Sequence, residues 1–326
     1  MRVLLVLVLL LTSCATRDRS QKLTIAVIPM GTTHEYWKSI HAGAVKAARE
    51  EGVEIIWKGP QKEDDRAQQI SVVEDMISRR VDGIVLAPLD GKGLRKPIAE
   101  ARRAGIPAVI VDSGLEGDDP ISFIATDNYK GGQLGAQRLL EVMGGKGSIV
   151  LMRVMVGAES TMRREQGFLD EIRKHPAIRV LSDNQYGGIT TETAYQLGEN
   201  LLNRFAELDG IFCPNESTTF GMLRALTDAG KAGRVKFVGF DSSDKLITAL
   251  RQKQIQGLVL QNPFRMGELG VQTLVKHLKD PAAPLEKRVD TGAVVATPEN
   301  MDTPAIQILL SPPIDQYLSH IFSHRS

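Results

Sequence analysis

The sequence predicts an α/β fold of two lobes, each built on a parallel sheet with helices on both faces. From Leu23 onward, short apolar runs alternate with amphipathic helical patterns, which is typical of parallel sheets covered by helices. The segment Gly83 to Asp112 (GIVLAP…AGIPAVIVDS) is similar in sequence to Gly210 to Asp241 (GIFCPN…AGRVKFVGFDS). Each segment predicts a βαβ unit that ends on an aspartate. More than ten strand patterns exceed one comfortable doubly wound sheet, so two Rossmann-like lobes are favoured over one.

The elements follow from the apolar patterns in chain order. Strands are predicted at 23–28, 53–57, 83–88, 106–112, 121–126, 147–152, 178–186, 209–214, 235–240, 255–261 and 291–297, and helices at 35–51, 63–80, 94–104, 129–143, 160–174, 191–205, 217–229, 244–252 and 264–278. A short helix, a Pro-Pro break and a final packing segment complete the chain.

The pattern restarts near residue 126, where Asp127 and Asn128 read as a helix cap, and this is the natural seam between the lobes. Crossings near 126, 261 and 290 would form a three-strand hinge. The N-terminal lobe is then expected to comprise 22–126 plus 262–289, and the C-terminal lobe 127–261 plus 290–326.

The first residues differ in character from the rest. Val3 to Leu11 is an unbroken apolar run, too short to span a bilayer and typical of a signal peptide over 1–13. The sequence Leu11-Thr12-Ser13-Cys14 resembles the bacterial lipobox, which implies cleavage before Cys14 and a lipid on its thiol, with 14–21 as a tether to the membrane. The alternative is an ordinary secretory peptide cleaved elsewhere.

Several function classes are disfavoured by composition and motif. The formal net charge is +1, with no long run of one sign, so no nucleic-acid footprint is present. The sequence contains no GxSxG, Walker, HExxH or strand-following GxGxxG motif, so no catalytic residue or cofactor is expected. His34 and His41 lack a third partner, so no metal site is expected either. Cys213 lies within a strand pattern and is expected to be a small buried hydrophobe.

Polar and aromatic residues cluster at strand ends, where ligands sit in open parallel sheets. Tyr36 and Trp37 follow the first strand and could stack on a sugar ring, although one of them could instead anchor the helix in the core. Asp112 and Asp241 end their strands in both copies of the repeat. A shared ligand explains that recurrence, and helix capping is the alternative.

Three further residues complete the predicted site. Arg164, early in a helix, could reach over the cleft, with Arg163 the more solvated neighbour. Asn215 ends the strand GIFCPN and suits a hydroxyl, and Gln261 follows a strand at the proposed hinge. Charged hydrogen bonds contribute about 1.5–3 kcal/mol each, so a few of them with one stacked ring could support binding near micromolar.

A family resemblance rests on these motifs. The lipobox, the aromatic pair before HAGA, and PAVIVDS, IATDN, RREQGF, PNESTTFGMLRAL, VGFDSS and VLQNP resemble the ribose-type periplasmic sugar-binding proteins, nearly end to end. The resemblance implies the type I periplasmic binding protein fold, with two lobes closing over a sugar that an ABC transporter permease takes up. It implies ring-stacking aromatics, sugar-gripping carboxylates, an arginine and amides at the residues already identified, namely Tyr36, Trp37, Asp112, Asp241, Arg164, Asn215 and Gln261.

The chain also departs from that pattern. Ser113 stands where ribose binders have an arginine, Ala87 where they have an asparagine, and His34 where an asparagine precedes the aromatics. These changes remove donors from the first lobe and leave room. The sequence therefore predicts a larger, modified or less oxygenated ligand than ribose.

The leading hypothesis is a monomeric, lipid-anchored solute receptor of the periplasm or cell surface that delivers its ligand to an ABC importer. A receptor that presents the ligand to a membrane kinase or chemoreceptor is the alternative. The effector domain of a sugar-responsive regulator is disfavoured, because an export signal occupies the place of its helix-turn-helix. An enzyme is disfavoured by the missing motifs.

Overall fold

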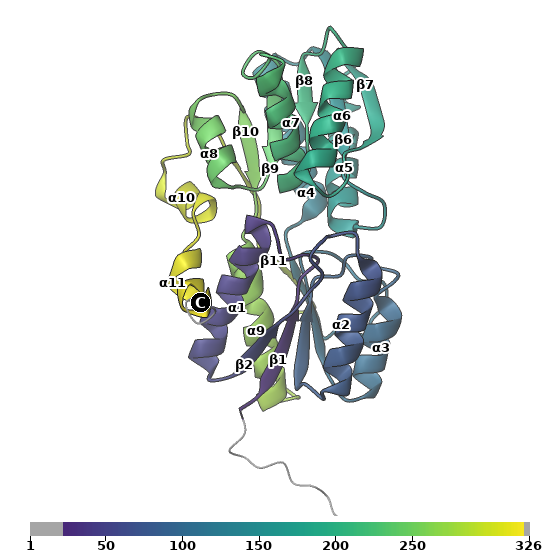
Figure 1. The fold of residues 1–326 in the computed structure, drawn as a ribbon, viewed down its shortest axis with the longest axis vertical. Coiled ribbons are helices and arrows are strands. Elements are labelled where there is room, and N and C mark those ends of the chain that lie inside the picture. Colours follow the sequence, from purple (N-terminus) through teal and green to yellow (C-terminus); the bar gives the residue numbers. More distant parts are fainter. Residues whose placement is uncertain (1–21, 323–326) are drawn as a thin grey trace, which may run out of the picture.

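The computed structural model describes residues 22–322, which form two lobes stacked along the long axis of the molecule (Figure 1). Each lobe contains one six-stranded sheet, with helices on both faces. The predicted α/β fold with two parallel-sheet lobes is confirmed. The predicted signal peptide and Cys14 lie outside the described residues.

The N-terminal lobe is built on a sheet of order β11-β5-β4-β3-β1-β2, with every pair parallel. Trp37 and Ile40 of one helix and Leu274 of another pack on one face, and Met76 and Ile98 pack on the other. Its elements are β1 (Thr24–Ile28), α1 (Glu35–Glu51), β2 (Glu54–Trp57), α2 (Arg66–Ser78), β3 (Gly83–Leu86), α3 (Arg95–Arg103), β4 (Ala108–Val111), β5 (Ser122–Ala125), α9 (Pro263–Lys279) and β11 (Arg288–Asp290).

The C-terminal lobe repeats this plan with a sheet of order β12-β10-β9-β8-β6-β7, parallel except for the edge strand β12. Its elements are α4 (Asn128–Met143), β6 (Gly147–Arg153), α5 (Glu159–Ile172), β7 (Ile178–Tyr186), α6 (Thr191–Arg204), β8 (Gly210–Phe212), α7 (Glu216–Asp228), β9 (Lys236–Phe240), α8 (Asp244–Arg251), β10 (Gly257–Leu260) and β12 (Val294–Ala296).

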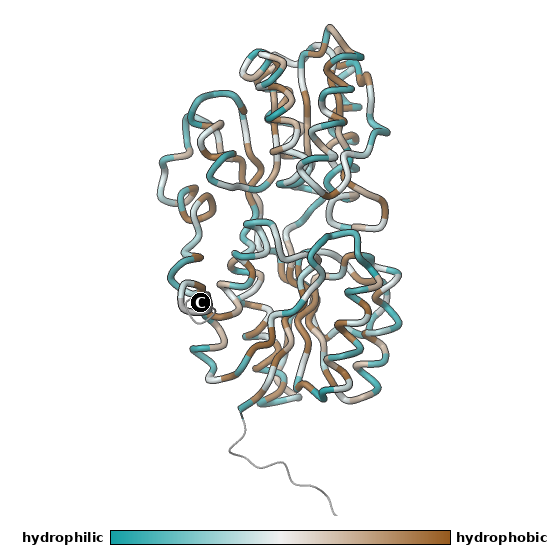
Figure 2. The backbone as a smooth tube through the Cα atoms, in the orientation of Figure 1, coloured by the Kyte–Doolittle hydropathy of each residue, from teal (hydrophilic) through white to brown (hydrophobic). Residues whose placement is uncertain are grey.

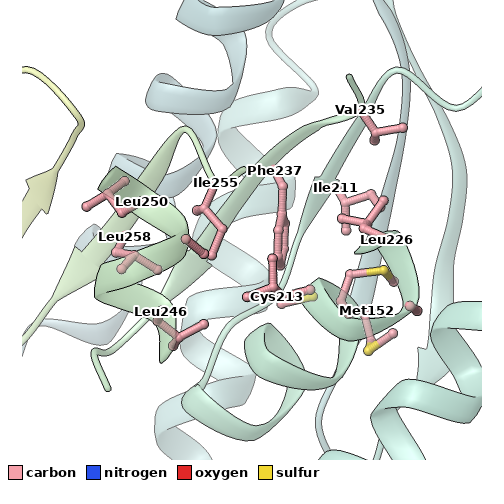
Figure 3. Packing of buried hydrophobic residues seen from close by; sticks show 14 of the residues in the cluster. Met152, Ile211, Cys213, Leu226, Val235, Phe237, Leu246, Leu250, Ile255 and Leu258 are labelled. Atoms are coloured by element: carbon pink, nitrogen blue, oxygen red, sulfur yellow. The ribbon is translucent and has the colours of Figure 1, made fainter. Parts of the chain in front are cut away.

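The core of the C-terminal lobe shows why the apolar runs become buried strands. Leu226, Leu246 and Leu250 project from helices onto Phe237 of β9 (Figure 3). Cys213 is fully buried in the same cluster, as predicted for a small hydrophobe. Hydrophobic residues concentrate along the strands of both lobes (Figure 2).

Three connections lie between the two sheets. The chain leaves the N-terminal sheet after β5 at 126–127, returns between β10 and α9 at 261–262, and passes between β11 and β12 at 291–293. The sequence predicts hinge crossings near 126, 261 and 290. Asp127 caps α4 by accepting a hydrogen bond from the Lys130 amide, as the sequence suggested.

The end of the chain differs from the prediction that 290–326 belongs to the C-terminal lobe. Helix α10 (Pro304–Leu310) packs into that lobe, but α11 (Ile314–Phe322) lies against α1 of the N-terminal lobe. Leu318 is buried there against Ala42 and Val45. The prolines at 312 and 313 prevent α10 from continuing. Between α10 and α11 the chain therefore passes from one lobe to the other once more.

Helix pairs in both lobes meet at glycines. A Cβ at Gly132 of α4 would lie 1.9 Å from the Arg164 carbonyl oxygen of α5. A Cβ at Gly167 of α5 would lie 2.0 Å from the Tyr129 carbonyl oxygen of α4. Gly43 and Gly267 relate α1 and α9 in the same way. These contacts set how closely each pair of helices approaches.

Within residues 22–322, no helix is both long enough and apolar enough to cross a membrane.

Candidate functional site

A cavity lies between the lobes, where the carboxyl ends of the strands of both sheets face each other. It contains all seven residues predicted to bind ligand, although they come from segments spread over more than 200 positions. We call it the interlobe cavity, and its lining residues are Met30, His34, Tyr36, Trp37, Glu63, Asp112, Val154, Met155, Ala158, Ser160, Thr161, Arg164, Asn215, Glu216, Asp241 and Gln261.

Asp112 and Asp241 occupy equivalent places, directly after β4 and β9. Both have left-handed backbones, with φ of 64° and 68°, which is costly for a residue other than glycine. Both are buried, at 3% and 7% exposure. Neither is the N-cap residue of a helix, so capping in that sense does not explain the recurrence.

The two aromatic side chains at the start of α1 both line the cavity. Their rings meet edge to face with centroids 5.0 Å apart. The Tyr36 hydroxyl donates to Asp112 Oδ1 at 2.5 Å, and the Trp37 indole donates to Glu63 Oε1 at 2.6 Å. Each ring is therefore held in place by a carboxylate.

Arg164 is buried at 3% exposure and held from several sides. Its Nε donates to Asn128 Oδ1 at 2.7 Å, and its Nη1 donates to the Pro214 carbonyl oxygen at 2.9 Å. The guanidinium stacks over Phe240, and its Nη2 lies 4.0 Å from Asp112 Oδ1. Arg163 is exposed, as predicted.

The two amides differ in how their hydrogen bonds are used. Asn215 is the N-cap of α7: its Oδ1 accepts from the Thr218 amide and hydroxyl, and its Nδ2 donates to the Ser217 hydroxyl. Gln261 donates to Asp241 Oδ1 at 2.7 Å, while its buried Oε1 has no partner among the described residues. Gln261 thus keeps an acceptor unused, and Asn215 is committed to the helix end.

Three charged residues of the cavity were not predicted as ligand contacts. Glu63 accepts from His34 Nδ1 at 2.5 Å, and Glu216 accepts from the Tyr36 amide at 3.2 Å across the lobes. Glu216 directly follows Asn215 at a strand end, which was a usable signal. Glu63 was hidden inside the predicted helix 63–80, whereas α2 begins at Arg66 after the cap residue Asp65.

The burial of these groups changes their protonation. Desolvation raises the pKa of Asp112 to about 6 and that of Glu216 to about 7, and it also raises the pKa of Asp241. Burial alone would lower the pKa of His34, but its hydrogen bond to Glu63 and the nearby carboxylates outweigh that effect and raise it to about 9. His34 is therefore an imidazolium at neutral pH.

Hydrogen bonds between the lobes hold them together beside the cavity. The Ser160 amide donates to the Ser113 hydroxyl, and the Gly114 amide donates to Glu159 Oε2, each at 3.2 Å. With the Tyr36–Glu216 bond, these contacts describe a closed arrangement. Residues that follow the strands of one lobe thus form direct hydrogen bonds with residues of the other lobe.

Known proteins resemble this chain in sequence and in architecture. A family described as "Periplasmic binding protein domain" matches residues 25–282. The ribose import binding protein RbsB of Haemophilus influenzae is 27% identical over 270 residues, covering 83% of this chain and 90% of that protein.

Two solved structures agree closely with the fold. A carbohydrate transporter solute binding protein from Agrobacterium radiobacter, in complex with D-arabinose, is 33% identical and has a TM-score of 0.85, covering 90% of this chain and all of that one. An ABC transporter solute binding protein from Agrobacterium vitis with bound D-fucose is 35% identical, also at a TM-score of 0.85, covering 88% of this chain and all of that one. The ribose-type resemblance is thereby confirmed, and the chain belongs to the periplasmic binding protein family, whose members are extracytoplasmic transport receptors.

Proposed function

We propose that this protein is an extracytoplasmic receptor that binds a sugar or sugar-like molecule in the interlobe cavity and delivers it to an ABC importer. The observation that carries the proposal is the convergence of Tyr36 and Asp112 from one lobe with Arg164 and Asp241 from the other. Relatives of the same fold are solute binding proteins with bound sugars. A ligand held by both lobes would stabilise the closed form.

Each predicted residue has a chemical role in this proposal. The faces of Tyr36 and Trp37 offer apolar area to the C–H side of a sugar ring. The buried carboxylates of Asp112 and Asp241 accept hydrogen bonds from hydroxyls, and Arg164 supplies donors. Gln261 Oε1 adds an acceptor, and the polar end of α7 at Asn215 borders the ligand.

Release would require the lobes to separate. We assign the hinge to the three connections at 126–127, 261–262 and 291–293, each of them short and between the two sheets. The segment carrying α10 and α11 spans the lobes as well and would move with them. The ligand leaves chemically unchanged, because the proposed roles of the site residues are hydrogen bonding and stacking. The proposal involves no covalent step and no cofactor. We propose that the receptor acts as a monomer.

Binding should be visible through Trp37. In a Trp57→Phe background, Trp37 is the single tryptophan, and a panel of pentoses, hexoses and their derivatives should include one that changes its fluorescence. Asp241→Asn should weaken that ligand by 10- to 100-fold, since a charged acceptor is lost. Asp244→Asn, an exposed neighbour, is the control. A panel that produces neither a fluorescence change nor a thermal shift would contradict the proposal.

We further propose that Cys14 carries lipid and anchors the protein to the membrane. The apolar run before it and the lipobox-like Leu11-Thr12-Ser13 support this. Cys14→Ser should move the protein produced in a bacterial host from the detergent phase to the aqueous phase of a Triton X-114 separation, whereas Cys213→Ser should not. If Cys14→Ser protein remained in the detergent phase, anchoring through this residue would be refuted.

A further inference from the structure

The interlobe cavity has an excess of acceptors and of negative charge. Four carboxylates line it, those of Glu63, Asp112, Glu216 and Asp241, against two cationic side chains. With all six groups ionised, the charge of the lining would be −2. A neutral sugar brings no charge to offset that imbalance, so with such a ligand the carboxyls would have to take up protons, because unpaired charge in a buried site is costly.

The two cations are already engaged. His34 Nδ1 bonds Glu63 Oε1 at 2.5 Å, which pairs one carboxylate with one cation. Arg164 lies nearest to Asp112, with its Nε and Nη1 donated to oxygens of Asn128 and Pro214. Neither cation forms an ion pair with Glu216 or Asp241 within the described part of the chain.

Glu216 and Asp241 are neighbours. The Glu216 amide donates to Asp241 Oδ2 at 3.2 Å, which places the backbone of one beside the carboxylate of the other. Desolvation raises the pKa of both side chains, and the attraction of His34 for Glu216 and of Arg164 for Asp241 offsets only part of that rise, so both carboxyls keep their protons more readily than solvated ones. A cationic group on the ligand would replace those protons.

An independent observation also points to a donor on the ligand. Gln261 is 3% exposed and lines the cavity, and its Oε1 has no partner among residues 22–322. Its orientation is fixed, because Nε2 donates to Asp241 Oδ1 at 2.7 Å and a flipped amide would set two acceptors against each other. The free acceptor thus belongs to a residue bonded to Asp241, one of the two cavity carboxylates without an ion pair among the described residues.

We propose that the ligand is a sugar or polyol carrying an amine, whose ammonium group lies beside Asp241, Glu216 and Gln261. An ammonium brings a positive charge and several donors, matching two carboxylates and one amide oxygen. The same charge balance disfavours sugar acids and sugar phosphates. This inference rests on the proposed function and narrows its ligand class.

The test compares amines with their neutral parents. Calorimetric titration would use 1-amino-1-deoxyalditols and hexoses aminated at C2, C3 or C6, each beside the compound with a hydroxyl at that carbon. At least one amine should bind tenfold or more tightly than its parent at pH 7. Glu216→Gln should reduce that amine-to-parent ratio by about tenfold, and the exposed Glu192→Gln should leave it unchanged.

The outcomes distinguish the amine proposal from the sugar-receptor proposal. If a neutral sugar binds as tightly as every amine, or more tightly, the amine proposal is wrong and the sugar receptor stands. If neither kind binds, both fail. If Glu216→Gln unfolds, the wild-type ratio still decides, since a ratio of one or less is sufficient to reject the proposal.

Discussion

Arg164→Met is expected to destabilise the ligand-free protein by about 3–5 kcal/mol at pH 8, as measured by urea unfolding, and to abolish ligand binding. The guanidinium is 3% exposed and is the cation nearest to Asp112. Removing one partner from a buried charged network leaves the other charges uncompensated. The Asn128 and Pro214 oxygens would lose their donor as well.

The effect should be smaller at pH 5. The pKa of Asp112 is already about 6, and removal of the arginine raises it further, so protonation at low pH relieves the unpaired charge. Arg163→Met is the matched control, because Arg163 is exposed on the same helix, and it should change stability by less than about 0.5 kcal/mol. Equal stabilities of the two variants at pH 8 would show that Arg164 is not part of a buried network.

Gly132→Ala is expected to destabilise the protein by about 3 kcal/mol, measured by the same unfolding experiment. Glycine to alanine inside a helix ordinarily stabilises by about 0.5–1 kcal/mol, so the sign itself is informative. Here the new Cβ would lie 1.9 Å from the Arg164 carbonyl oxygen and 2.9 Å from the Phe168 amide nitrogen. Helices α4 and α5 must separate to admit it.

The same substitution should weaken ligand binding, because the backbone that it displaces carries Arg164. Gln137→Ala, at an exposed position of α4, is the control and should leave stability and binding within experimental error of wild type. A Gly132→Ala protein as stable as the Gln137→Ala protein would mean that the helix contact is looser than described.

Much of the architecture could be predicted because strand and helix periods alternate without interruption. The repeat ending at Asp112 and Asp241 located the site, since carboxyl ends of parallel strands in two lobes must face one cleft. The left-handed backbone at both aspartates could not be inferred, because aspartate adopts a positive φ more often than most residues other than glycine but still does so rarely.

The parts of the site and of the fold that the sequence did not predict depend on tertiary contacts. Glu63 lies in the loop before α2, where the polar sequence resembles the first turn of a helix. Its place in the cavity is seen only from its hydrogen bonds to His34 and Trp37. Asn215 is at the predicted place, but its amide caps α7. The crossing of α11 to α1 likewise depends on burial of Leu318, which periodicity alone cannot assign to one lobe.

The central claim is that one ligand is held by both lobes in the interlobe cavity. A crystal structure of the full chain with its tightest-binding sugar or amino sugar tests this most directly. We predict that the ligand lies against Tyr36 or Trp37, with hydrogen bonds to Asp112 from one lobe and to Arg164 and Asp241 from the other. A ligand bound outside this cavity, or contacting only one lobe, would contradict the claim.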